Sequence, residues 1–370
     1  MVKRRKFRMY DEDVYTNFGE QPAPFEIQLG YGLIPLVDES KESNLQRQIN
    51  YCRNQIDAEY GLPIPTVHIR DNMCLEPYEY SILFNGVEVG KSYVRLGYHL
   101  CIDSGSVTSQ LDCSFCDKTK EPAFGMDAFW ISDEEYGKYN NAGYVCVPPE
   151  KVMGTHLSEI IRKNRTRILN QNMVCNLIDK VRKSNPDVIS DVFFNKGFKI
   201  SDMKTVLNQL LAEEVSIRDM NTILETVADY LGEEKSPVLL EKKVRERLAL
   251  SIIQKYADEN KTVHVIRLSE KATCFLADHI YFPSSKVEAP YFALEPIDRK
   301  KLTESLSYAI KEFAEKNHPT VFLCVADIRM AFFNTLKKEF PGIYVISDKE
   351  MYEVKDVFAV QLEGELSLDE

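Results

Sequence analysis

Two cysteines carry the one spacing in this sequence that could bind a metal or exchange electrons. Cys113 and Cys116 form a C-x-x-C, a motif used by zinc sites and by dithiol redox centres. A structural zinc ion needs two further ligands, and the sequence holds no second C-x-x-C and no H-x-x-x-H. The nearest candidates are His99 and Cys101, which would have to fold back onto the pair.

A redox role for the same pair requires a thiol with a lowered pKa, as found at helix N-termini or beside cations. Asp112 and Asp117 flank the motif instead, and negative charge raises the pKa of a thiol. Two interpretations stand side by side: a thioredoxin-like dithiol oxidoreductase or zinc module that uses Cys113 and Cys116, or two thiols in a solvated loop. The sequence favours the loop.

The motifs of the common catalytic sites are missing from the sequence. It has no G-x-x-x-x-G-K-[ST], G-x-G-x-x-G, H-E-x-x-H or G-x-S-x-G. The six histidines are far apart, and each is expected on the surface or in a core with a hydrogen-bond partner. We therefore predict no catalytic residue, no metal and no cofactor, in a protein that is not an enzyme.

An apolar run, EPAFGMDAFWI, follows the cysteines at residues 121–131. Pro122 and Gly125 interrupt regular structure around Phe124, which places this aromatic side chain in a turn. Phe124 is then either a plug in the core or an anchor at the rim of a groove, with Glu121 as its polar partner. Interface hot spots are often aromatic and rigidly held, so the second interpretation predicts a protein-docking site.

Charge and composition limit the partners. The net charge of the 370 residues is −11, which argues against nucleic acid as the main partner. Basic residues gather at residues 3–8, either as a solvated tail or as a segment next to a membrane span. No run approaches the roughly 18–20 apolar residues of a span. The nine cysteines are dispersed and do not predict a disulfide framework, which fits a reducing cytoplasm.

The elements that must position these residues begin with a mixed α/β segment. Residues 43–61 have helical periodicity, with Ser43 as a possible cap and Gly61 at the end. Asn85-Gly86 predicts a hairpin turn. Ser132 and Glu135 match the S-x-x-E pattern of a capping box, which predicts the start of a helix that ends at Gly143.

The second half begins with helices and ends with alternating strands and helices. Residues 150–248 are almost entirely helical in pattern, with a break at Val215 and an S-x-x-D cap at Ser216 and Asp219. Beyond 250, short apolar strands alternate with helices, which predicts a further α/β unit.

Six motifs in order resemble one family. LGYGLIPLVD, HIRDN, FNGVEVG, EPAFGMDAFWI, GYVCVPPEKVMGTHLSEII and LLAEEVSIRDMNTILETVADY are similar to the cytoplasmic half of the FlhA/SctV (FHIPEP) export-gate proteins of flagellar export and type III secretion. The resemblance covers residues 27–250, and we predict the injectisome branch. It implies the cytoplasmic domain of a bacterial inner-membrane protein, whose membrane half would precede the basic residues.

The resemblance also implies an architecture of four subdomains after a linker at 1–26. A thioredoxin-like α/β subdomain would comprise 27–98 and 149–168, with a small α+β (ferredoxin/RRM-like) subdomain inserted at 99–148. A helical subdomain at 169–248 and a C-terminal α/β subdomain at 249–370 would follow. The expected assembly is a homo-nonameric ring that closes through heterologous contacts.

In flagellar members of the family, a dimple between the first two subdomains receives chaperone–substrate complexes. The motifs that form it correspond here to Glu121, Phe124 and Thr155, with Pro122 and Gly125 shaping the turn. Glu121 replaces the family's Asp, and Thr155 could instead be a helix N-cap. The resemblance implies further partners in a gatekeeper, other export-apparatus proteins and the secretion ATPase complex.

Overall fold

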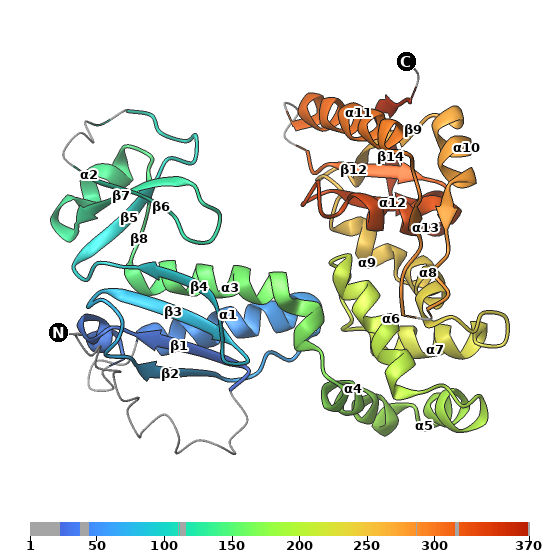
Figure 1. Ribbon diagram of the computed structural model, residues 1–370, viewed down its shortest axis with the longest axis horizontal. Helices are drawn as coiled ribbons and strands as arrows, with labels where there is room; N and C mark the ends of the chain where they lie inside the picture. The colour runs from blue at the N-terminus through green and yellow to red at the C-terminus, as the bar shows by residue number, and fades with distance from the viewer. Residues whose placement is uncertain are drawn as a thin grey trace, which may run out of the picture. The chain divides into compact units, whose positions relative to one another are not determined.

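A computed structural model describes residues 23–37, 44–109, 111, 116–285, 287–314 and 318–368. The chain divides into two compact units (Figure 1). Unit 1 comprises Met1–Ile56 and Ile64–Asn164, and unit 2 comprises Asp57–Pro63 and Arg165–Glu370. The predicted helix cap Ser43, the basic cluster at residues 3–8 and Cys113 lie outside the described residues.

The first sheet of unit 1 combines parallel and antiparallel pairs. Its strand order is β2 (Val67–Asp71), β1 (Phe25–Leu29), β3 (Glu79–Phe84) and β4 (Val87–Tyr93), and a 3-10 turn, η2 (Tyr31–Leu36), follows β1. Only β1 and β2 run parallel. Helices α1 (Asn44–Tyr60) and α3 (Pro149–Ile168) lie side by side against this sheet (Figure 1). Phe25 is fully buried in β1, so the sheet begins inside the linker predicted at 1–26.

Turn chemistry explains two of the boundaries that the sequence predicts. Asn85 and Gly86 join β3 to β4 with φ of 49° and 79°, the left-handed pair that a two-residue hairpin requires. Gly61 follows the last residue of α1 with φ of 67°, as a helix C′ residue does. Both predictions are confirmed.

A second small sheet completes unit 1. Its order is β6 (Asp117–Lys120), β7 (Asp127–Ser132), β5 (Tyr98–Ile102) and β8 (Val145–Val147), accompanied by η4 (Asp133–Glu135) and α2 (Tyr136–Asn141). The predicted capping box is wrong, because the Ser132 side chain accepts no cap hydrogen bond and a 3-10 turn precedes α2. Gly143, with φ of 95°, ends this segment as expected.

Two cysteines of this sheet form a disulfide, although the dispersed cysteines of the sequence do not predict a disulfide framework. Cys101 on β5 and Cys146 on β8 are directly opposed in register and form a disulfide. The sequence hides the pair because 45 residues separate the two positions, whereas the antiparallel sheet brings them together.

Unit 2 begins with helices. They are α4 (Gln171–Ser184), α5 (Pro186–Ile189), the π-helical turn η5 (Ser190–Asn195), α6 (Ile200–Ala212), α7 (Met220–Tyr230), α8 (Pro237–Arg247) and α9 (Ala249–Gln254). The break at Val215 falls between α6 and α7, as predicted. The cap of α7 is Asp219 rather than Ser216, since the Asp219 carboxylate accepts the N–H of Thr222.

A parallel sheet ends the chain. Its order is β13 (Tyr344–Ser347), β12 (Val321–Cys324), β9 (Thr262–Leu268) and β14 (Ala359–Leu366). Its companions are α10 (Glu270–Asp278), the short strands β10 (Ile280–Tyr281) and β11 (Tyr291–Phe292), α11 (Pro296–Ala314), α12 (Ala326–Leu336) and α13 (Asp348–Glu353). The predicted mixed α/β fold is confirmed, and the division into four subdomains stays a prediction.

Replacing Gly61 by alanine should destabilise unit 2 more than an equivalent change at Gly197. Both glycines have left-handed backbones, with φ of 67° and 66°, which costs an alanine about 1–2 kcal/mol. A Cβ on Gly61 would also lie 2.5 Å from backbone atoms of Arg218, whereas none lies within 4 Å of a Cβ on Gly197. Urea unfolding of the two variants measures the difference, and equal losses would contradict the packing argument.

Five charged side chains are buried together in unit 2. They are Glu213, Glu241, Arg245, Arg329 and Glu350, none more than 6% exposed. Arg329 donates to Glu213 and, at 2.9 Å, to Glu241, while Arg245 donates to Glu350 at 2.6 Å and to Glu213 at 3.1 Å. Since three carboxylates face two guanidiniums, one bound proton makes the cluster neutral.

Glu241 is the group that holds this proton. Burial raises the pKa of Glu241 to about 8. The positive charge of Arg329 lowers this pKa, and the negative charge of Glu213 raises it. Its Oε1 has no hydrogen-bond partner among the described residues. Arg245 attracts the charged form and Glu350 repels it, so the other members of the cluster act in opposite directions.

Stability of unit 2 should therefore fall as pH rises from about 4.5 to about 8. In this window the folded state keeps a proton on Glu241 that the unfolded state has lost, so unfolding releases a proton. Glu241→Gln mimics the neutral form and should flatten this part of the pH profile. Urea midpoints of both proteins between pH 5 and 9 provide the measurement, and parallel profiles would rule out titration of Glu241.

Candidate docking site

A tight turn between β6 and β7 presents the residues that the sequence singles out. We call residues 121–126 the docking loop. The N–H of Glu121 donates to the carbonyl of Met126 at 2.8 Å, and the N–H of Gly125 donates to the carbonyl of Glu121 at 2.9 Å. Gly125 has φ of 74°, which a side chain disfavours. The loop is thus closed by its own backbone.

The side chain of Glu121 also belongs to the turn. It is 4% exposed. One carboxylate oxygen accepts the N–H of Ala123 at 2.9 Å, and the other accepts the N–H of Phe124 at 2.7 Å. Both oxygens are therefore engaged inside the loop, and Glu121 is not the exposed polar partner at the rim that the sequence predicts.

Phe124 points out of the core. It is 60% exposed, and Met126 two residues later is 43% exposed, whereas Ala123 between Phe124 and the turn start is 7% exposed. The interpretation of Phe124 as a core plug is wrong. Pro122 is half-buried and Gly125 is exposed, so the turn holds an apolar side chain in solvent.

Thr155 lies on the exposed side of α3. Its position, six residues after Pro149 at the helix start, excludes the N-cap alternative. The next residue, His156, is 7% exposed, and its Nδ1 lies 2.9 Å from the hydroxyl of Tyr80 on β3. His156 is thus a core histidine with a hydrogen-bond partner, as predicted for the histidines in general.

Tyr80 on β3 is a buried hydrogen-bond partner of α3. Burial raises the pKa of Tyr80, and the charge of Glu121 raises it further. Burial lowers the pKa of His156 to about 4, with a smaller effect of Lys163. The imidazole is therefore neutral at pH 7. Tyr80 was not among the predicted site residues, although a tyrosine at an inward position of a strand is a signal that could have found it.

The described cysteines give no support to the alternative zinc or dithiol site. Cys116 is half-buried, with its sulfur 3.5 Å from the hydroxyl of Tyr139. Cys101, one of the two further candidate zinc ligands, is bonded to Cys146. Within the described part of the chain there is no group of three or more residues arranged to hold a metal ion.

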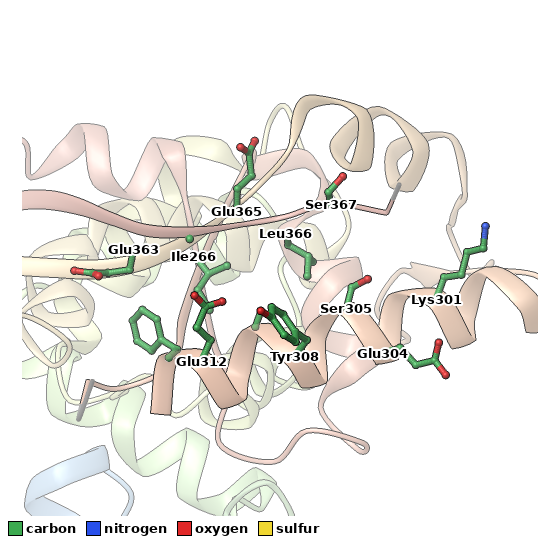
Figure 2. A pocket seen from close by; sticks show the side chains of 13 residues that line it. Ile266, Lys301, Glu304, Ser305, Tyr308, Glu312, Glu363, Glu365, Leu366 and Ser367 are labelled. Carbon is green, nitrogen blue, oxygen red and sulfur yellow. The ribbon is translucent and has the colours of Figure 1, made fainter. Parts of the chain in front are cut away.

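A cavity of about 480 Å³ lies in unit 2 between α11 and β14 (Figure 2). Its rim includes carboxylates that already have partners: Glu304 pairs with Lys300 at 3.7 Å and Glu365 with Arg267 at 3.5 Å. Because these charges are compensated inside the unit, the docking loop remains our candidate site.

Among the described helices, none is long and apolar enough to cross a membrane.

These features describe a mixed α/β protein with an exposed apolar loop. The FHIPEP family model matches residues 5–356, and this chain therefore belongs to the FHIPEP family. The predicted resemblance is confirmed. The flagellar biosynthesis protein FlhA of Treponema pallidum is 34% identical over 331 residues, which are 89% of this chain and 46% of that protein. This chain thus spans about half the length of such relatives.

Solved structures share the fold. The Chlamydia pneumoniae CdsV protein superposes with a TM-score of 0.80 at 23% identity, covering 95% of this chain and 99% of that one. The nonameric EscV cytosolic domain from the type III secretion system has a TM-score of 0.71 at 18% identity, covering 94% and 97%. Since relatives from both flagellar export and type III secretion match, the injectisome branch stays a prediction.

Proposed function

We propose that this chain is a cytoplasmic part of an export gate and that it receives chaperone–substrate complexes at a docking surface formed by Phe124, Met126 and Thr155. The observation that carries the proposal is the exposure of Phe124 on a turn with fixed backbone hydrogen bonds. A rigid aromatic side chain loses little conformational entropy when it enters a partner's apolar pocket.

We also propose that copies of this chain assemble into a ring. The EscV cytosolic domain has been solved as a nonamer, and the shared fold supports the same closed, heterologous assembly for this chain. About half of each FlhA relative lies outside this chain, and that part would anchor the ring at the bacterial inner membrane. CdsV has been solved in complex with CdsO, which supports a further partner from the export apparatus.

A titration can test the docking role. Calorimetry should show that a secretion chaperone loaded with its substrate binds this chain, and that the free chaperone and the free substrate bind more weakly. Flagellar and injectisome chaperones run in parallel would assign the branch. If no loaded chaperone of either class binds, even when the chain is concentrated enough to assemble, the docking proposal fails.

A further inference from the structure

Glu121 occupies a position that a partner cannot easily reach. It is 4% exposed, although the neighbouring Phe124 is 60% exposed. A carboxylate that contacts a docked protein at the rim would be exposed before binding and would use at least one free oxygen. Here each oxygen accepts a backbone N–H of the loop, at 2.9 Å from Ala123 and 2.7 Å from Phe124.

The two hydrogen bonds have a direct effect on Phe124. They fix the backbone on both sides of the Cα of Ala123, and the N–H of Phe124 donates to a carboxylate that is itself buried. With this N–H bonded to Glu121 and Ala123 packed at 7% exposure, the Phe124 side chain lies on the solvent side of the loop, at 60% exposure. Hydrogen bonds to a charged acceptor are stronger than those between neutral groups, so an ionised Glu121 is well suited to this task.

We propose that Glu121 is a positioning residue of the docking surface: its buried carboxylate holds Phe124 outward and does not touch the docked chaperone–substrate complex. This inference rests on the proposed function. It replaces the rim contact that the sequence suggested for the acidic residue. An Asp carboxylate also accepts backbone N–H groups two and three residues further on.

A double-mutant cycle with Phe124 separates positioning from contact. Glu121→Gln keeps the size of the side chain but offers one acceptor oxygen to two N–H groups, and we expect it to weaken binding of the loaded chaperone by about tenfold. In the Phe124→Ala background the same change should have almost no further effect, because there is no aromatic side chain left to position. Equal losses in both backgrounds would overturn the proposal.

Two more readouts distinguish the roles. Glu121→Asp retains two acceptor oxygens and should restore binding to within about threefold of the unmodified chain. The loss caused by Glu121→Gln should be the same at low and high salt, because a contact between charges across an interface weakens as salt rises. A loss that shrinks strongly at high salt would indicate a direct ionic contact and would contradict positioning.

Local order can be measured without a partner. In Glu121→Gln, amide exchange at Ala123 and Phe124 should accelerate at least about tenfold, while the fluorescence of Trp130, which is 3% exposed, should stay unchanged. Altered Trp130 fluorescence would indicate a collapsed unit 1 and would count against a local role. If Phe124→Ala alone leaves binding unchanged, the proposed function fails. If Phe124→Ala weakens binding but the losses caused by Glu121→Gln and Phe124→Ala simply add, the positioning role fails and the proposed function stands.

Discussion

Replacing Arg329 by methionine should lower the free energy of unfolding of unit 2 by about 3–5 kcal/mol. The side chain of Arg329 is 2% exposed, and its guanidinium pairs with Glu213 and Glu241. Without it, Arg245 alone would have to compensate the buried carboxylates of Glu213 and Glu350, because Glu241 is protonated, and Glu213 would lose one of its two cationic partners. The loss follows mainly from the charge left uncompensated, since methionine fills much of the same volume.

Two comparisons make this measurement specific. Arg182→Met removes an exposed pair with Asp179, whose side chains are 55% and 54% exposed, and should change stability by at most about 1 kcal/mol. Trp130, the one tryptophan, lies in unit 1, so its fluorescence reports that unit separately from the circular dichroism of the whole chain. A loss for Arg329→Met no greater than that for Arg182→Met would show that the buried cluster does not hold unit 2 together.

Phe124→Ala should weaken binding of a loaded chaperone by about 1–3 kcal/mol, which corresponds to roughly fivefold to a hundredfold in Kd. Phe124 is 60% exposed in the free chain, so docking would remove most of an aromatic ring from water. Since the loop backbone is closed by its own hydrogen bonds, truncation should leave the stability of unit 1 almost unchanged. The effect should appear mainly as faster dissociation.

Phe282→Ala is the matched control for this experiment. Phe282 is 59% exposed but belongs to unit 2, far along the chain from the docking loop. Its truncation removes the same group at almost the same exposure and should leave the affinity for the loaded chaperone unchanged. Equal losses for the two variants would indicate non-specific apolar binding, and no loss for Phe124→Ala with the fold intact would remove Phe124 from the docking surface.

Local chemistry made much of the fold predictable. The Asn85-Gly86 turn, the helix end at Gly61 and the strands of unit 2 all follow from short-range patterns that the tertiary structure preserves. Caps were less predictable, because Ser132 and Ser216 match a capping motif that the chain does not use. A short polar side chain near a helix start has several hydrogen-bond options, and only the path of the backbone selects among them.

The candidate site shows where sequence reasoning stops. Pro122 and Gly125 predict a turn, but they do not determine whether Phe124 faces the core or the solvent. That direction depends on Glu121, whose charge suggests exposure and whose carboxylate is buried by two backbone hydrogen bonds. The pairing of Cys101 with Cys146 was hidden in the same way, since it depends on strand register rather than on spacing.

Hydrogen exchange across the whole chain, with and without a loaded chaperone, tests the docking role most directly. We predict slower exchange at residues 121–126 and along α3 around Thr155, and no change along α11 and β14 beside the cavity of unit 2. The same footprint should vanish with Phe124→Ala. Protection confined to α11 and β14, with the docking loop unaffected by a bound chaperone, would contradict the account.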